Sequence, residues 1–196
     1  MSDSLRSPLV AALRALTGWL NALPAPAVVV GGVAASLLGR PRFTQDIDAL
    51  ILLPESAWAD ALTRASDFHL AVRVEKPLDF ARKARVLLLR HSPTLIDVDI
   101  ILGALPFETE AVQHGIEVQL EDVTIRLPRV EDLLIMKAIA HRPRDLEDIE
   151  ALLAANSTID LVRVRRWVAE FARAATMPEL IDEFERLISN SRQSIP

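Results

Sequence analysis

Two short apolar stretches of this sequence each contain a pair of aspartates separated by one apolar residue. The first pair is Asp46 and Asp48 in DIDALILL, and the second is Asp97 and Asp99 in LIDVDIIL. Because side chains alternate between the two faces of a β-strand, the aspartates of each pair share one face. Two neighbouring carboxylates repel each other, and burying them without a partner costs free energy. We therefore expect a cation to compensate them.

A hard divalent cation such as Mg²⁺ suits this arrangement, because Mg²⁺ favours one or two carboxylates together with phosphate oxygens and water. If the second strand lies beside the first, Asp99 would join Asp46 and Asp48 at one metal site. Asp99 is favoured over Asp97 because it lies deeper in its apolar run. Either pair alone could also be a solvated strand face, and the role of Asp97 stays open. Two such pairs in one small domain favour the metal site.

Gly31 and Gly32 separate a β-branched run, residues 27–30, from a short helical segment. Glycine at such a junction lets the backbone approach a ligand closely, and the N–H groups of the following helix point towards an anion. The alternative is a tight turn that uses glycine only for its permissive dihedral angles. The order of strand, Gly-Gly, short helix and carboxylate strand favours phosphate binding.

The pattern of the chain changes near residue 129. Before it, an N-terminal helix is followed by strand patterns at 27–30, 46–53, 69–75, 84–90 and 95–102 and by a hairpin at 116–128. After it come four segments with helical spacing of apolar residues. These patterns predict an α+β fold, with a mixed β-sheet core and its flanking helices in residues 1–128 and a C-terminal helical region in residues 129–196.

The composition excludes several classes of protein. A net charge of -5 argues against a protein that coats nucleic acid, and the lack of cysteine excludes disulfides and thiolate chemistry. The N-terminal segment, broken by Arg14 and by prolines, predicts an amphipathic helix and not a signal peptide. Since no uninterrupted apolar run reaches about 18 residues, we expect a cytoplasmic protein with no membrane association.

The order of these motifs resembles the DNA polymerase β-type nucleotidyltransferase superfamily. It is most similar to the small bacterial nucleotidyltransferases of the AbiEii type, from type IV toxin–antitoxin pairs. In these proteins a GG…R.T.DID motif is followed by a helical EDL…K…R..D..D segment. This chain contains GGVAASLLGRPRFTQDIDALI and then VEDLLIMKAIAHRPRDLEDIEALL. The resemblance covers roughly residues 25–155.

The resemblance implies a nucleotidyltransferase fold and an enzyme that transfers a nucleotidyl group from an NTP to an acceptor. It implies two Mg²⁺ ions bound by the catalytic residues Asp46, Asp48 and Asp99. The residues that we expect to contact the nucleotide or its phosphates are Gly31, Gly32, Arg40, Arg42, Lys137 and Asp145.

Four of these positions have structural alternatives. Arg40 and Arg42 could simply face solvent. Lys137 lies in an apolar helical run, where its stem could pack while its ammonium group reaches water. Asp145 could act as a helix N-cap, with the role of Asp148 left open.

The acceptor stays open between tRNA, a protein and a small molecule, and a toxin of this kind would have a cognate antitoxin. The alternative is a catalytically silent nucleotidyltransferase fold that serves as a binding or antitoxin-like partner module. The three aspartates argue against this alternative, because a silent copy has no physical need for clustered charge.

Overall fold

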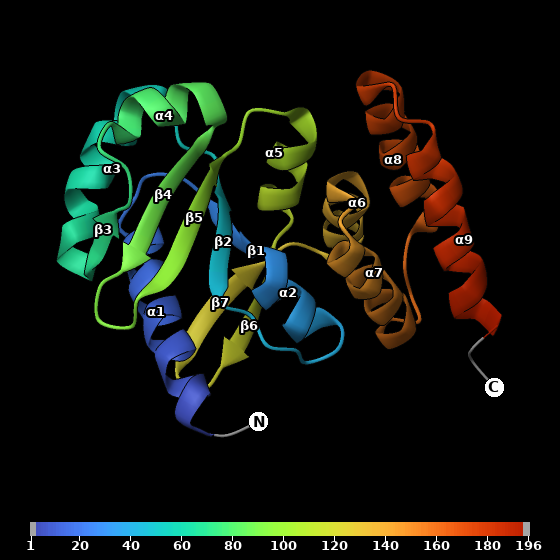
Figure 1. Cartoon of the computed structure of the whole chain (residues 1–196), viewed down its shortest axis with the longest axis horizontal. Helices are drawn as coiled ribbons and strands as arrows, with labels where there is room; N and C mark the ends of the chain where they lie inside the picture. The colour runs from blue at the N-terminus through green and yellow to red at the C-terminus, as the bar shows by residue number, and fades with distance from the viewer. Residues whose placement is uncertain (1–2, 194–196) are drawn as a thin grey trace. The chain divides into compact units, whose positions relative to one another are not determined.

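The structure is a computed structural model that describes residues 3–193 (Figure 1). The chain forms two compact units. The first extends to Val33 and resumes over Phe43–Leu127, and the second contains Ala34–Arg42 and the chain from Pro128 onward. The predicted boundary after residue 128 had placed residues 34–42 with the first domain, whereas here they group with the helical second unit. A side-chain hydrogen bond contributes, since Asn156 Nδ2 donates to the carbonyl oxygen of Leu38 at 2.9 Å.

A five-stranded mixed sheet lies at the centre of the first unit, in the order β1-β2-β5-β4-β3. β2 and β5 are parallel, and every other pair of neighbours is antiparallel. The predicted α+β fold with a mixed sheet is therefore confirmed. The strands are β1 (Ala27–Val30), β2 (Asp46–Ile51), β3 (Leu70–Val72), β4 (Val86–His91) and β5 (Ile96–Leu102).

One face of this sheet is packed against helix α1 (Asp3–Asn21), which runs behind the strands in Figure 1. Ile47, Val98 and Leu89 on that face have no exposed surface, and Leu16 and Trp19 of α1 are equally buried. Strand alternation sends the aspartates of β2 and β5 to the opposite face. The burial of the apolar positions therefore fixes the side on which the carboxylates emerge.

The other elements of the first unit cover the edges of the sheet. The β6–β7 hairpin is confirmed, with Glu121 in its turn at a φ of 53°. The predicted strand over residues 69–75 is too long: β3 ends at Val72, because the chain turns at residues 73–76 into α4, whose first residue is Pro77. The sequence pattern did not predict α4. These elements are α3 (Trp58–Ala65), α4 (Pro77–Ala84), α5 (Pro106–Gln113), β6 (Ile116–Leu120) and β7 (Val123–Leu127), while α2 (Gly31–Leu38) begins in the first unit and continues into the second.

The second unit contains the four predicted C-terminal helices in its described part. They are α6 (Val130–Ala140), α7 (Pro143–Ala155), α8 (Leu161–Ala175) and α9 (Glu179–Gln193). A buried ion cluster joins α6 to α8: Asp132, with no exposed surface, lies 2.7 Å from Arg163 Nη2 and 3.2 Å from Arg129 Nε. Between residues 3 and 193, no helix has both the length and the apolar character needed to cross a bilayer.

Replacing Asp132 with asparagine should destabilise the second unit by about 3 kcal/mol, because removing one partner from a buried ion pair leaves the other charge uncompensated. Urea unfolding followed by circular dichroism measures the change. Glu183→Gln is the matched control: its ion pair with Arg186 is largely exposed on the arginine side, so it should cost less than about 1 kcal/mol. Equal costs for the two variants would contradict the role of the Asp132 cluster.

Candidate active site

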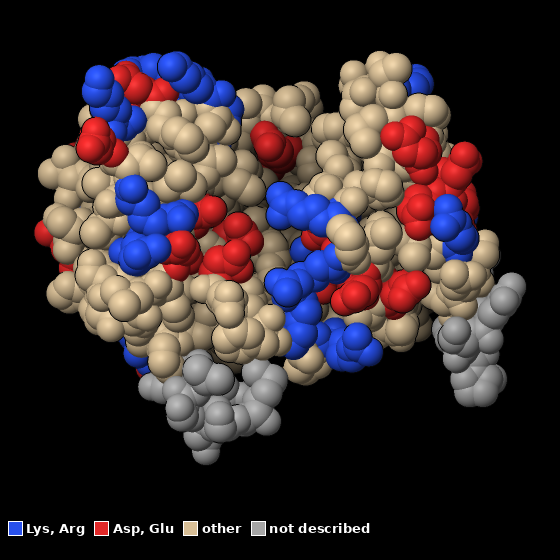
Figure 2. Space-filling view, viewed as in Figure 1, with Lys and Arg blue, Asp and Glu red and all other residues tan. Residues whose placement is uncertain are grey.

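The parallel pairing of β2 with β5 brings the two aspartate pairs together. In this register Asp46 lies opposite Asp97, and Asp48 lies opposite Asp99. Residues directly opposite on neighbouring strands share a face, so all four carboxylates emerge on the side of the sheet away from α1. Asp46 is exposed and the other three are partly buried. Figure 2 shows acidic and basic side chains adjoining each other over these strands. We call this surface the carboxylate face.

Thr44 supports the first of these aspartates. Its buried hydroxyl donates a hydrogen bond to Asp46 Oδ1 at 3.0 Å. The hydroxyl therefore limits the orientations of the Asp46 carboxylate without adding charge to the site.

Gly31 lies against the second aspartate. It is the first residue of α2 and has a φ of +63°, in the left-handed region that favours glycine. A Cβ atom added at this position would lie 1.9 Å from Asp48 Oδ2. Gly31 therefore has both features that were predicted for this position, a dihedral angle that favours glycine and a close approach of the backbone to another group. The group that it approaches here is the carboxylate of Asp48. Gly32 is buried in the first turn of α2. Phosphate binding by either glycine stays a prediction.

Arg73 supplies a cation that the sequence reasoning missed. It follows β3, and its guanidinium donates to Asp97 Oδ2 at 2.8 Å and also to Asp99 Oδ1. Arg90, directly opposite Asp97 in the β4–β5 register, donates from Nε to Asp97 Oδ1 at 2.6 Å. The sequence shows arginines near the ends of two strands, but it does not reveal the strand register that brings them to these carboxylates.

The environments of Asp97 and Asp99 move their pKa values in opposite directions. The pKa of Asp97 is lowered, chiefly by the hydrogen bond from Arg90 and further by the charge of Arg73. The pKa of Asp99 is raised: burial is the largest cause, the charge of Arg73 offsets it only in part, and the negative charges of Asp97 and Asp46 add to it. Asp99 is thus the carboxylate that would gain more from an additional cation.

The donors on the carboxylate face are of the type that Mg²⁺ prefers, since they are carboxylate oxygens on two adjacent strands. Within residues 3–193 no three acidic, histidine or cysteine side chains form a ready-made ligand cluster. The carboxylate oxygens of this donor set fit a hard divalent cation, with Asp99 oriented here towards Arg73.

Lys137 and Asp145 belong to a separate ion cluster in the second unit. Lys137 Nζ lies 2.7 Å from Asp145 Oδ1 and 2.9 Å from Asp148 Oδ2, and all three side chains are less than a tenth exposed. Arg42 binds Asp148 through Nε at 2.7 Å and Nη2 at 2.8 Å, in the bidentate geometry that favours arginine. Lys137 is therefore paired and not extended to water, and nucleotide contact by these residues stays a prediction.

The acidic members of this cluster have distinct environments. Asp145 lies in the first turn of α7, where its Oδ2 accepts a hydrogen bond from the backbone of Arg142, so it caps the helix from within and is not the N-cap residue. Burial would raise the pKa of Asp148, but the hydrogen bonds from Arg42 and Lys137 outweigh burial and leave that pKa lowered.

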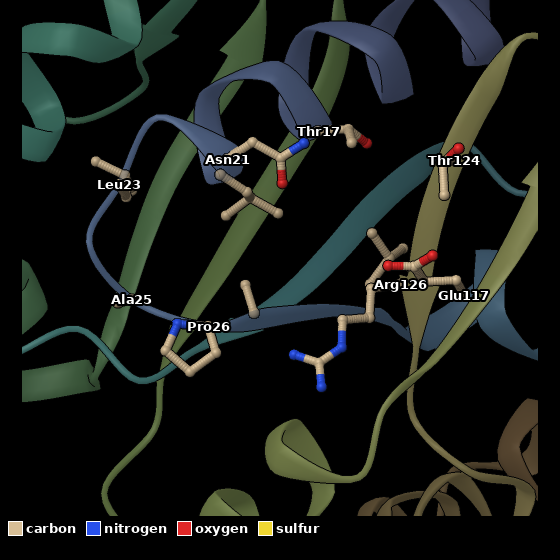
Figure 3. Close-up of a pocket in the computed structure, with 11 residues that line it drawn as sticks. Thr17, Asn21, Leu23, Ala25, Pro26, Glu117, Thr124 and Arg126 are labelled. Atoms are coloured by element: carbon tan, nitrogen blue, oxygen red, sulfur yellow. The ribbon is translucent and has the colours of Figure 1, made fainter.

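Each unit also contains a cavity. Arg40 lines a hollow of about 560 Å³ in the second unit together with Glu147 and Glu150. A cavity of about 300 Å³ in the first unit lies between α1 and the β6–β7 hairpin, where Figure 3 shows Glu117 close to Arg126. Neither cavity is lined by a residue of the carboxylate face, and the role of Arg40 stays a prediction.

Gly31→Ala should destabilise the protein by about 1–3 kcal/mol, since the new Cβ meets the Asp48 carboxylate in a backbone conformation that alanine disfavours. Chemical denaturation of the single variants and the double variant with Asp48→Ala separates the two causes. The cost should be smaller in the Asp48→Ala background, where the carboxylate is absent. Equal costs in both backgrounds would show that the contact with Asp48 plays no part.

Asp148→Asn should lower the free energy of unfolding by about 3 kcal/mol at neutral pH, because it removes one carboxylate from a buried cluster with two cations. A lowered folded-state pKa contributes stability above the unfolded value, near pH 4, and that stability is lost as the pH falls through the folded pKa. The difference between wild type and Asp148→Asn should therefore shrink below about pH 4. Denaturation profiles against pH measure it, and a constant difference down to the acid limb would contradict the assignment.

The chain is similar to known proteins over nearly its whole length. The family model described as nucleotidyl transferase AbiEii toxin, type IV toxin–antitoxin system, matches residues 14–194. An antigenic nucleotidyltransferase-like protein from Paracoccidioides brasiliensis superposes with a TM-score of 0.54 at 15% identity, over 89% of this chain and 91% of that one. The lincosamide antibiotic adenylyltransferase LnuA, solved with lincomycin bound, gives 0.51 at 16% identity, over 72% of this chain and 94% of that one.

At these identities the two structures establish the nucleotidyltransferase fold and nothing finer. No curated protein matches the sequence closely enough to count as a relative. The family match extends well beyond residues 25–155, where the motifs lie, and confirms the resemblance that they carry. The chain therefore belongs to the AbiEii family of nucleotidyltransferase toxins.

Proposed function

We propose that this protein transfers a nucleotidyl group from an NTP to an acceptor at the carboxylate face. The observation that carries the proposal is the register of β2 and β5, which sets Asp48 opposite Asp99 and leaves Asp46 next to both on the same open face. Membership of a nucleotidyltransferase family supports it. A purely structural role gives no reason to place these like charges on adjacent strands.

Asp46, Asp48 and Asp99 would hold two Mg²⁺ ions, which when bound supply positive charge for the attacking and leaving oxygens of an in-line displacement at the α-phosphate. Asp46 and Asp48 would serve as the shared ligands, with Asp46 oriented by Thr44. Asp99 would accept the proton of the acceptor hydroxyl as the new phosphoester bond forms and pyrophosphate leaves.

Gly31 contributes by having no side chain. The start of α2 can then lie directly against Asp48, so the partial positive charge of the helix N-terminus acts on the same small region as the carboxylates. That region suits the phosphates of an NTP, which bring negative charge and need close backbone approach. Positioning and electrostatics would provide most of the catalysis, as in other phosphoryl transfers.

Arg40, Arg42, Lys137 and Asp145 remain proposed nucleotide-contacting residues of the second unit. Lys137 and Arg42 could serve phosphates only by exchanging part of their pairing with Asp145 and Asp148. Their first role is therefore the stability of the second unit, and contact with the triphosphate is a second role that we propose on the strength of the family motif.

The family description supports a toxin with a cognate antitoxin. We propose that it acts in the cytoplasm on tRNA or a protein. A small-molecule acceptor is a second candidate, favoured by the fold that the chain shares with a lincosamide adenylyltransferase. A silent binding module is the third. The aspartates of the carboxylate face argue against it, because their repulsion serves no purpose without a cation to bind.

Incubation with Mg²⁺ and each α-labelled NTP, in the presence of tRNA, cell protein or a lincosamide-type acceptor, should give label transfer and pyrophosphate release with at least one acceptor. Asp46→Asn, Asp48→Asn and Asp99→Asn should each lower the rate about 100-fold or more, because each removes charge from the reacting centre.

Asp60→Asn is the matched control, since Asp60 lies in an exposed ion pair with Arg64 on α3, outside the carboxylate face. Its activity should equal that of wild type, and thermal unfolding should show that all four variants are folded. An unchanged rate in Asp99→Asn would refute the assignment of that residue. Absence of both NTP binding and turnover in wild type would favour the silent module.

A further inference from the structure

Arg73 is the arginine that contacts Asp99 on the carboxylate face. Its guanidinium bridges Asp97 and Asp99, and its side chain is only 22% exposed. Its backbone N–H donates to the carbonyl oxygen of Leu88 at 2.9 Å, which extends the β3–β4 pairing by one residue. Leu88 in turn lies opposite Asp99. Strand register therefore aims Arg73 at Asp99.

The two carboxylates that Arg73 bridges are held differently. Both oxygens of Asp97 are engaged, Oδ1 with Arg90 and Oδ2 with Arg73. Asp99 is joined to Arg73 through Oδ1, and its other oxygen has no hydrogen bond to any residue that the structure describes. Exchange of Arg73 for another cation at Asp99 would thus leave the bond between Arg73 and Asp97 intact.

The surroundings allow such an exchange. Arg73 and Arg90 line a cavity of about 300 Å³ at the edge of the sheet, together with Val72 and Leu95. The buried Nε of Arg73 has no hydrogen-bond partner within the described residues, so this side chain is not fully satisfied where it lies. A guanidinium tethered to Asp97 has room to withdraw from Asp99 into this cavity.

We propose that Arg73 is an internal counter-ion that competes with the divalent cation for Asp99, and that Asp97 is a positioning residue that holds Arg73 and not a metal ligand. This inference rests on the proposed metal site and extends it. It gives Asp97 a role, and it makes the affinity of the protein for metal depend on an arginine that is not a ligand.

Mn²⁺ titration followed by the electron paramagnetic resonance of unbound Mn²⁺, with and without a nonhydrolysable nucleoside triphosphate, tests the proposal without measuring activity. Arg73→Gln should bind Mn²⁺ roughly tenfold more tightly than wild type, because a charge-assisted pair no longer competes. Asp97→Asn should retain Mn²⁺ binding, whereas Asp99→Asn should lose it. Arg73→Met, which keeps the apolar stem, should behave like Arg73→Gln and replaces it if that variant does not fold.

Arg90→Gln is the matched control. It removes the same charge from the same face but leaves Arg73 on Asp99, so its affinity for Mn²⁺ should change less than about threefold. Equal tightening by Arg90→Gln and Arg73→Gln would overturn the proposal, because net charge alone would then explain the effect.

The other outcomes separate this inference from the proposed function. Equal Mn²⁺ affinities of wild type and Arg73→Gln would overturn the role of Arg73 and leave the metal site standing. Loss of binding in Asp97→Asn as complete as in Asp99→Asn would make Asp97 a ligand and overturn its positioning role. Absence of Mn²⁺ binding in wild type and every variant would overturn the metal site and this inference together.

Discussion

The parallel pairing of β2 with β5 is the constraint on which the rest of the first unit depends. It sets Asp46 opposite Asp97 and Asp48 opposite Asp99, so the sheet can form only if the surroundings compensate the repulsion. Arg73, which follows the edge strand β3, and Arg90 on β4 contribute positive charge, and Thr44 in the loop before β2 contributes a hydroxyl. Gly31 at the start of α2 also contributes, because only a residue without a side chain lets the start of the helix lie against Asp48.

The second unit also contains neighbouring carboxylates, but their negative charge is compensated in a different way. Asp145 and Asp148 are almost fully buried, but Lys137 and Arg42 pair with them at hydrogen-bonding distance, and the pKa of Asp148 is lowered as a result. The positive and negative charges of such a cluster balance each other, and the cluster stabilises the packing around it. On the carboxylate face Asp97 contacts two arginines and Asp99 contacts one, and burial raises the pKa of Asp99. A cluster with balanced charge suits a structural role, whereas carboxylates with fewer cationic partners suit the binding of an exchangeable cation.

Much of the architecture could be predicted from the sequence, because apolar periodicity reports which face of an element is buried. The D-h-D strands, the hairpin and the four C-terminal helices were found in this way. Periodicity does not report which strands are neighbours or in what register, so the contact of Arg73 with Asp99 was missed. It also failed for the short amphipathic helix α4, and it could not reveal that Lys137 of α6 is paired with two aspartates of α7.

Asp97 and Asp99 differ in their contacts, although they lie two positions apart on one strand and share Arg73. Only Asp97 also binds Arg90. The pKa of Asp97 is lowered, chiefly by the hydrogen bond from Arg90, whereas burial raises the pKa of Asp99. Opposite shifts of neighbouring carboxylates accompany a division of labour in enzymes. Under the role proposed for Arg73, Asp97 keeps the arginine while Asp99 exchanges it for the divalent cation.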